Sequence, residues 1–158
     1  MKAIIMAAGV GKRLYALNIN KPKCLINIGS TTLIHRSVNL LLSKGISDIT
    51  VIVGFMAHLI RNELNNDVAY FENPDFHSTN SIKSLWYAKD LLEDNVLLLN
   101  GDLYYEHSIL DYAINQTNAV VMLADSTRIN NADYRFGFIG DQINRFGKHL
   151  TNQETDGE

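Results

Sequence analysis

The sequence predicts an α/β fold in which a doubly wound, mainly parallel sheet is followed by an antiparallel hairpin. Short apolar runs typical of buried strands alternate with segments whose apolar residues recur at helical spacing, as in parallel strands joined by crossover helices. A glycine-rich stretch follows the first apolar run directly. Near the carboxyl end, strand-like segments at 135–139 and 142–146 flank Gly140-Asp141, a two-residue hairpin signal.

The first elements follow from these patterns in chain order. Residues 2–8 (KAIIMAA) are predicted to form a buried strand, and residues 48–54 (DITVIVG) a second one. Between them, an apolar stripe predicts a helix that Ser30 or Thr31 caps and Gly45 ends.

The remaining elements continue the alternation up to the hairpin. Helices are predicted at 56–64, 80–92 and 108–115. Strands are predicted at 68–71, 96–99 and 119–124, the last one buried. A loop containing Pro74 is predicted at 73–79. We find no repeat or linker, so residues 1–158 are expected to form one domain.

Composition narrows the class of protein. With 158 residues, 46% of them hydrophobic, the chain can bury one sizeable core. No apolar stretch is long enough to cross a bilayer and the start lacks the features of a signal peptide, so we expect a soluble cytoplasmic protein with no membrane partner. The single cysteine, Cys24, excludes an internal disulfide, and the five histidines lack metal-ligand spacing, which argues against zinc.

Charge is distributed unevenly along the chain. Residues 1–47 contain seven Lys or Arg residues and no acid, whereas the whole chain has a net charge of −3, so the remainder carries −10. This asymmetry predicts an anion site near the amino terminus. A basic tail for nucleic acid would give the same count, but the segment is rich in Ile, Leu, Ala and Gly and patterned as folded structure. No nucleic-acid partner is therefore expected.

The strongest motif follows the first strand. Residues 7–14 read AAGVGKRL, and Lys21-Pro22-Lys23 comes soon after. Glycines allow the backbone to approach a ligand closely and to present N–H groups to phosphate oxygens, while Lys12, Arg13 and the two later lysines supply countercharge. The third glycine of the dinucleotide fingerprint is absent, as is the GxxxxGK[ST] of a P-loop. We interpret the motif as a triphosphate-binding loop.

A second motif, Asn100-Gly101-Asp102, lies at the carboxyl end of a predicted buried strand. Ligands bind at this end of open α/β sheets, and a carboxylate there can hold Mg²⁺ against nucleotide phosphates. Alone, Gly-Asp after a strand usually marks a turn. Together with the basic loop, it becomes a candidate magnesium site.

The order AAGxGxRL, KPK and strand-Gly-Asp resembles the nucleotidylyltransferases that activate sugar phosphates and phosphocholine. This resemblance covers nearly the whole chain and implies a GT-A-like, Rossmann-type fold. The middle segment, with Asn73-Pro74-Asp75-Phe76, Thr79-Asn80-Ser81 and Ser84-Leu85-Trp86, is similar to the phosphocholine cytidylyltransferase branch.

The resemblance also implies roles for individual residues. Gly9, Gly11, Lys12 and Arg13 would bind the nucleotide, with Arg13 also catalytic through the β- and γ-phosphates. Lys23 would contact the reacting α-phosphate or the incoming phosphate. The base would face the Ala8 backbone, Asn80 and Ser84, and Asp102 would bind Mg²⁺. Helix capping for Asn80 and a helix-surface position for Ser84 remain alternatives. Trp86 and Tyr87 are expected in the core.

The expected activity is Mg²⁺-dependent transfer of a nucleoside monophosphate, CMP from CTP, to a small phosphorylated acceptor such as phosphocholine. A sugar-1-phosphate nucleotidylyltransferase and a non-catalytic nucleotide-sensing domain remain alternatives, and a homodimer is left open. Because similar enzymes continue well beyond a Gly-Glu pair like Gly157-Glu158, we expect a catalytic domain that lacks its C-terminal part. Aromatic candidates for binding a quaternary ammonium group are Phe76, Trp86, Tyr104 and Tyr105.

Overall fold

A computed structural model describes residues 1–11, 20–125, 127, 134–151 and 155 of the chain. The chain forms two compact units, Met1–Leu110 and Asp111–Glu158. Among the described residues, no helix has both the length and the apolar composition needed to cross a membrane.

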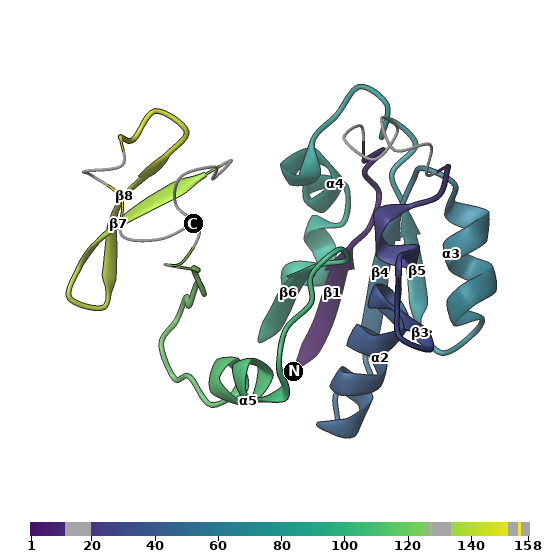
Figure 1. Cartoon of the computed structure of the whole chain (residues 1–158), viewed down its shortest axis with the longest axis horizontal. Helices are drawn as coiled ribbons and strands as arrows, with labels where there is room; N and C mark the ends of the chain where they lie inside the picture. Colours follow the sequence, from purple (N-terminus) through teal and green to yellow (C-terminus); the bar gives the residue numbers. More distant parts are fainter. Residues whose placement is uncertain (12–19, 126, 128–133, 152–154, 156–158) are drawn as a thin grey trace. The chain divides into compact units, whose positions relative to one another are not determined.

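A four-stranded parallel sheet forms the centre of the first unit (Figure 1). Its strands, in the spatial order β5-β4-β1-β6, are Ala69–Glu72, Ile49–Val53, Lys2–Met6 and Val96–Asn100. Ile5 of β1 lies opposite Val51 of β4 on one side and Leu99 of β6 on the other. Strand β4 is buried along its whole length, as expected for a parallel strand covered on both faces. These strands confirm the predicted α/β fold.

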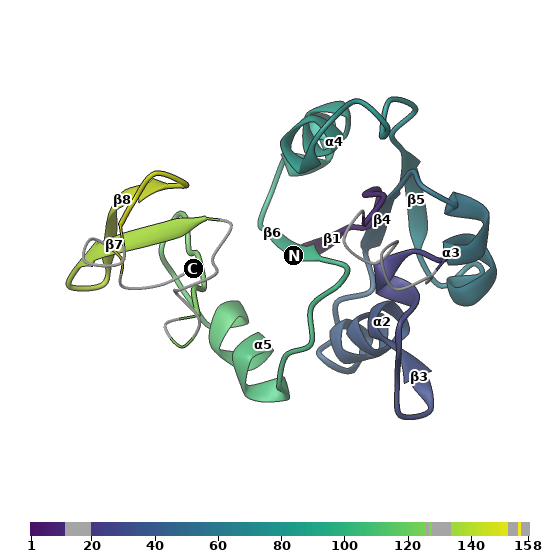
Figure 2. The same cartoon turned by 45° about the horizontal axis from the view of Figure 1, so that its top comes forward.

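Helices cover both faces of the sheet. Helix α2 (Leu33–Ser43), between β1 and β4, lies on the opposite side of the sheet from α4 (Ser81–Tyr87), between β5 and β6 (Figure 2). Helix α3 (Ala57–Leu64) connects β4 to β5 and buries Ile60 and Leu64. The chain therefore moves from β1 towards the β5 edge and then returns past β1 to β6. This reversal creates a topological switch point beside β1.

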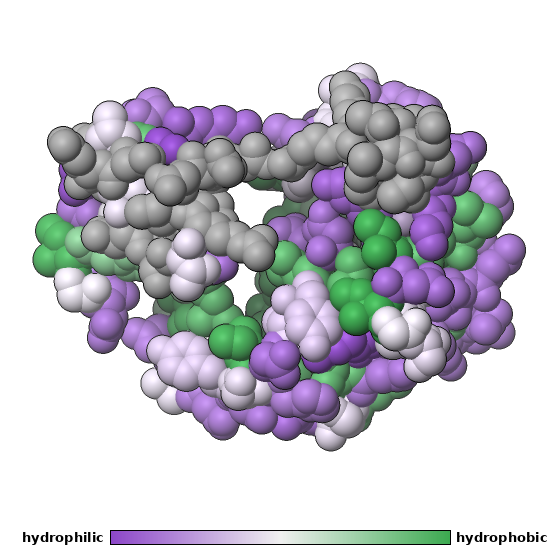
Figure 3. Space-filling model, in the orientation of Figure 1, coloured by the Kyte–Doolittle hydropathy of each residue, from purple (hydrophilic) through white to green (hydrophobic). Residues whose placement is uncertain are grey.

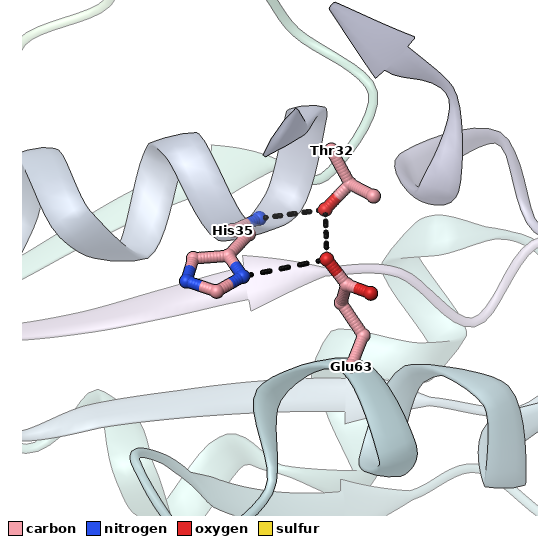
Figure 4. Close-up of polar contacts among 3 residues, drawn as sticks. All are labelled: Thr32, His35 and Glu63. Carbon is pink, nitrogen blue, oxygen red and sulfur yellow. Dashed lines mark hydrogen bonds and ion pairs between the residues drawn. The ribbon is translucent and has the colours of Figure 1, made fainter. Parts of the chain in front are cut away.

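Helix α2 is capped by Thr32 and joined to α3 through the same side chain. The Thr32 hydroxyl accepts a hydrogen bond from the His35 N–H (3.2 Å) and donates one to Oε1 of Glu63 (2.8 Å). Nδ1 of His35 lies 3.3 Å from that same carboxylate oxygen. A single oxygen of Glu63 on α3 thus meets two side chains at the start of α2 (Figure 4).

The prediction that Ser30 or Thr31 caps this helix is wrong. Thr31 belongs to β3 (Thr31–Thr32), which pairs with β2 (Asn27–Ile28) in a small antiparallel hairpin. Because the hairpin includes Thr31, the helix begins only at Leu33, and Thr32 is its cap. Gly45 ends the helix as predicted, with a φ of +76° that favours glycine.

The predicted helix at 80–92 is divided into two shorter helices. Helix α4 ends at Tyr87, and the 3-10 helix η2 follows at Lys89–Leu92. The short helix α4 packs with the face that carries Ser84 inward, and this side chain is 4% exposed. Trp86 lies on another face of the helix and is 60% exposed. The core position predicted for Trp86 is therefore wrong, whereas Tyr87 is half-buried.

The second unit contains the predicted hairpin. Strands β7 (Arg135–Ile139) and β8 (Gln142–Gly147) pair in antiparallel fashion around Gly140, whose φ is +58°. Helix α5 (His107–Ile114) begins in the first unit, which ends at Leu110, and its last residues belong to the second unit. The hairpin confirms the turn signal in the sequence.

The buried strand predicted at 119–124 is wrong. The structure has irregular backbone there, and Val120 is 86% exposed, with Val121, Met122 and Leu123 also exposed. An apolar run becomes a strand only beside a neighbour that pairs with its backbone, and no described strand pairs with these residues. On the face of the molecule drawn in Figure 3, green hydrophobic residues are exposed among purple hydrophilic ones.

Candidate functional site

A pocket of about 320 Å³ opens at the carboxyl ends of β1 and β6, beside the switch point. Four segments contribute its lining residues: the loop after β1 at 6–11, the turn at 23–24, positions within 76–84, and the end of β6 at 100–102. Every segment belongs to the first unit. The pocket therefore occupies the place where open α/β sheets bind ligands.

Most of the predicted site residues meet in this pocket. Those lining it are Ala8, Gly9, Gly11, Lys23, Asn80, Ser84 and Asp102. Lys12 and Arg13, predicted to bind phosphate, lie outside the described residues.

The backbone of the loop after β1 is held close to the sheet. The Ala8 carbonyl accepts a hydrogen bond from the Phe55 N–H (3.1 Å). Gly11 has a φ of +67°, and a Cβ there would lie 3.0 Å from Cγ of Lys23. Conformation and space both favour glycine at this position. A Cβ at Gly9 would meet nothing within 4 Å, so space remains beside this part of the loop.

Lys23 and Asp102 face each other across the pocket. Nζ of Lys23 lies 3.6 Å from Oδ2 of Asp102, and their side chains are 27% and 44% exposed. Lys23 starts the 3-10 helix η1 (Lys23–Leu25), which is anchored by its buried residues. Asp102 follows Gly101, whose N–H donates to the Met6 carbonyl (2.9 Å). A cation and a carboxylate held on separate elements can each serve a ligand of opposite charge.

Close packing behind Asp102 explains the glycine of the second motif. A Cβ on Gly101 would lie 3.1 Å from the Met6 carbonyl oxygen and 3.2 Å from Cβ of Ala7. The backbone of β6 could not then approach β1 as closely. Gly101 therefore allows the carboxylate that follows it to reach the pocket edge.

Cys24 lines the pocket as a buried neutral thiol. Burial and, to a smaller extent, the negative charge of Asp102 together raise its pKa from 9.0 to about 12. The thiolate is the nucleophilic form of cysteine, so this side chain is unsuited to nucleophilic chemistry at neutral pH.

Asn80 and Ser84 have structural partners in addition to their place in the pocket. Oδ1 of Asn80 accepts a hydrogen bond from the Lys83 N–H (3.0 Å), which confirms the helix-capping alternative. Ser84 is buried, so the helix-surface alternative is wrong. Its hydroxyl accepts from Nδ2 of Asn73 (2.8 Å) and donates to the Asn80 carbonyl (3.3 Å). Both side chains are thus held in place by hydrogen bonds within their own loop.

Two positions near the pocket were missed by the sequence prediction. A Cβ on Gly54 would lie 2.7 Å from Cβ of Phe76 and 2.9 Å from the Ala8 carbonyl oxygen, so glycine is needed where β4 ends. Asn73 is fully buried and bonded to pocket residues. The signals were a glycine closing a buried strand and an asparagine before proline, a combination typical of turns.

The four aromatic candidates for a quaternary ammonium site do not gather in one place. Phe76 lines the pocket, whereas Trp86, Tyr104 and Tyr105 do not. The guanidinium of Arg36 lies 4.3 Å from the ring centroid of Tyr104, so this ring already has a cation over its face. The described residues therefore form no aromatic cage.

Comparison with known proteins identifies a family. The family model described as nucleotidyl transferase matches residues 2–145. The chain is 28% identical over 135 residues to the CTP:phosphoglutamine cytidylyltransferase of Campylobacter jejuni, covering 80% of this chain and 53% of that protein. It is 34% identical over 99 residues to the 2-aminoethylphosphonate cytidylyltransferase of Lancefieldella rimae, covering 61% and 40%.

The chain is also similar to a solved structure of another cytidylyltransferase. The CTP:phosphocholine cytidylyltransferase of Streptococcus pneumoniae shares 34% sequence identity with this chain, with a TM-score of 0.59 over 64% of this chain and 44% of that one. The chain thus spans about half the length, or less, of the proteins it matches here.

Proposed function

This chain belongs to the nucleotidyl transferase family, and from that premise we propose that the protein transfers CMP from CTP to a small phosphorylated acceptor and releases pyrophosphate. The relatives described above support the cytidylyl group, because each is named as a cytidylyltransferase. Their named acceptors carry a phosphate or a phosphonate group. Phosphocholine is one such acceptor.

The observation that carries the proposal is the pocket in which Lys23 and Asp102 face each other beside the glycine loop. We assign the backbone of Gly9 and Gly11 to the triphosphate, together with Lys12 and Arg13 from the sequence. Lys23 is assigned to the reacting phosphates, because its ammonium group can neutralise charge that develops during transfer. The base is assigned to the side of the pocket formed by Asn80 and Ser84.

The acceptor itself supplies the nucleophile. A phosphate monoester is largely dianionic at neutral pH, with a second pKa of about 6, so no protein base has to remove a proton. An acceptor oxygen attacks the α-phosphorus of CTP, a new P–O bond forms, and the bond to pyrophosphate breaks. The protein contributes alignment and positive charge, and Lys23 in the lining of the pocket can supply that charge.

The donor set at Asp102 fits Mg²⁺. A partly exposed carboxylate is a hard oxygen ligand, and Mg²⁺ is commonly held by one or two carboxylates plus substrate phosphates. The described residues contain no group of three His, Cys, Asp or Glu side chains that could hold a metal without a substrate. Asp102 would hold the ion, which would neutralise phosphate charge when bound.

A substrate panel tests the proposal. Pyrophosphate release is measured with CTP, UTP, ATP or GTP, each combined with phosphocholine, 2-aminoethylphosphonate or glucose 1-phosphate, with and without Mg²⁺. We expect release to require CTP, Mg²⁺ and one of the first two acceptors. Release only with glucose 1-phosphate would favour a sugar nucleotidylyltransferase. When the panel is run on the natural full-length protein, nucleotide binding without release under any combination would instead indicate a sensing domain.

A further inference from the structure

Asn73 is a fully buried polar residue directly behind the pocket wall. Its Nδ2 donates hydrogen bonds to Oγ1 of Thr79 (3.0 Å) and Oγ of Ser84 (2.8 Å). Its Oδ1 accepts from the Asp75 N–H (2.9 Å). Both N–H bonds of the amide and its oxygen are therefore engaged, which is what a buried amide requires to offset its desolvation.

The same residue is anchored to the central sheet. The backbone N–H of Asn73 donates to the Val53 carbonyl (2.9 Å), at the end of β4. Asn73 thus connects a rigid strand to two residues, Thr79 and Ser84, that line the pocket, while it does not line the pocket itself. Asn80, which also lines the pocket, lies between those two residues in the chain.

Other polar groups of this loop are also satisfied within it. The Thr79 hydroxyl donates to the Asp75 carbonyl (2.8 Å), and the Tyr87 hydroxyl donates to the Asp75 carboxylate. An apolar residue at position 73 would leave the Asp75 N–H without its partner and remove the donor that meets Thr79 and Ser84. Leaving such groups unsatisfied is more costly than the bond itself is stabilising.

The phosphate side of the pocket is built differently. Gly9 and Gly11 follow β1, and Lys23 is held by the buried residues of η1. None of the side-chain hydrogen bonds of Asn73 reaches these elements. A change at position 73 therefore acts on one wall of the pocket and leaves the opposite wall in place.

We infer that Asn73 is a positioning residue that sets the affinity of the pocket for the nucleoside half of the nucleotide and not for its triphosphate half. This inference rests on the proposed function, which assigns the nucleoside to the wall containing Asn80 and Ser84. The residue acts through its two hydroxyl partners and does not touch the ligand.

The nucleoside and triphosphate contributions to binding can be separated by comparing two ligands that share only the phosphate chain. Isothermal titration calorimetry compares CTP with inorganic tripolyphosphate, both with Mg²⁺, on the wild-type protein and on Asn73→Ala. Loss of two hydrogen bonds that order the wall should weaken CTP binding about tenfold or more, while tripolyphosphate affinity changes by less than about twofold. If Asn73 contributed only to the stability of the fold, its replacement would change the affinities for CTP and tripolyphosphate to the same extent.

Three further variants make the comparison decisive. Asn73→Asp preserves the size of the side chain and the acceptor for the Asp75 N–H but loses the amide donor, so it should repeat the selective loss of CTP affinity. Asn39→Asp makes the same change on the exposed face of α2 and should leave both affinities unchanged. Val38→Ala removes a core side chain outside the pocket and should lower the Tm without selective loss of CTP.

Each outcome has a separate meaning. CTP and tripolyphosphate affinities that fall together in the Asn73 variants, or that both stay at the wild-type value, would overturn the role of Asn73 alone. A wild-type protein that binds tripolyphosphate but none of CTP, UTP, ATP and GTP would overturn the proposed function and this inference with it. Selective loss for an NTP other than CTP would support the role of Asn73 and contradict only the preference for cytidine.

Discussion

At the residue scale, the pocket depends on side chains whose functional and structural contributions can be separated. The ion pair between Lys23 and Asp102 is partly exposed on both sides. Pairs of this kind typically contribute about 1 kcal/mol or less to stability. Asp102 also has a second effect, because its charge raises the pKa of buried Cys24. Changes at these positions should therefore alter chemistry more than folding.

Lys23→Ala and Asp102→Asn should each abolish most activity and leave the fold intact. For Lys23→Ala we expect pyrophosphate release to fall about 100-fold or more, which corresponds to roughly 3 kcal/mol of transition-state stabilisation. For Asp102→Asn we expect the Mg²⁺-dependent release of pyrophosphate to be lost. Lys2→Ala, at the opposite end of β1, is the control. A variant that loses stability in urea unfolding but retains full activity would place its residue outside the site.

The Cys24 thiol should resist alkylation over an unusually wide pH range. Its pKa is raised from an ordinary value of 9.0 to about 12, so the folded protein favours the protonated thiol and the reactive thiolate forms only at high pH. The stability from this shift is fully present below about pH 9 and is lost as the pH rises towards 12. Iodoacetamide labelling followed by mass spectrometry should show slow modification at pH 8 in the native state and rapid modification in urea.

Asp102→Asn supplies the control for that measurement. Because the Asp102 charge contributes to the raised pKa, its removal should lower the pKa and speed labelling of the native protein at a given pH. Equal labelling rates in native and unfolded wild-type protein would show that Cys24 is accessible and ionised in solution.

At the element scale, the sequence predicts most strands and helices because their apolar periodicity reflects burial against the sheet. Central strand β4 and the β7-β8 hairpin fall where their patterns place them. The segment at 119–124 has the composition of a buried strand but no described strand to pair with, and composition cannot supply a partner. Local hydrogen bonds leave no periodic pattern in the sequence either. The role of Asn73 and the cap at Thr32 could therefore not be predicted.

Thr32→Ala should destabilise the protein by about 1–2 kcal/mol. The change removes the cap of α2, typically about 1 kcal/mol, together with the hydrogen bond to Glu63 on α3. Thr32→Ser keeps the hydroxyl and should retain most of the wild-type stability. Equilibrium urea unfolding at pH 7 measures both variants, and equal stability of the two would show that the hydroxyl contributes nothing.

At the scale of the whole molecule, every lining residue of the pocket in the described part of the chain belongs to the first compact unit. Its lining residues run from Met6 to Asp102, and that unit ends at Leu110. The sequence could predict which residues gather in this pocket, since its motifs follow the strands at whose ends the pocket opens. It could not show which face of α4 is buried, because a helix of seven residues gives too little periodicity to define one.

Limited proteolysis should cut the chain within residues 117–125, where the backbone is irregular and Val120 to Leu123 are exposed. Exposed irregular segments are preferred sites of proteolytic nicking. After cleavage by subtilisin, the amino-terminal product should bind CTP within about twofold of the intact protein, because it retains every described lining residue. Loss of binding on cleavage would show that the pocket needs residues from the second unit.

The strand order also has a consequence for protein synthesis on the ribosome. Strand β1 is made first, yet its two neighbours in the sheet are β4 and β6, and β6 ends at Asn100. The glycine loop therefore leaves the ribosome long before the strand and carboxylate that complete its pocket, with a delay on the order of 10 s at typical translation rates. During that interval the nascent chain exposes an apolar strand edge with no partner, which makes it a candidate for chaperone binding.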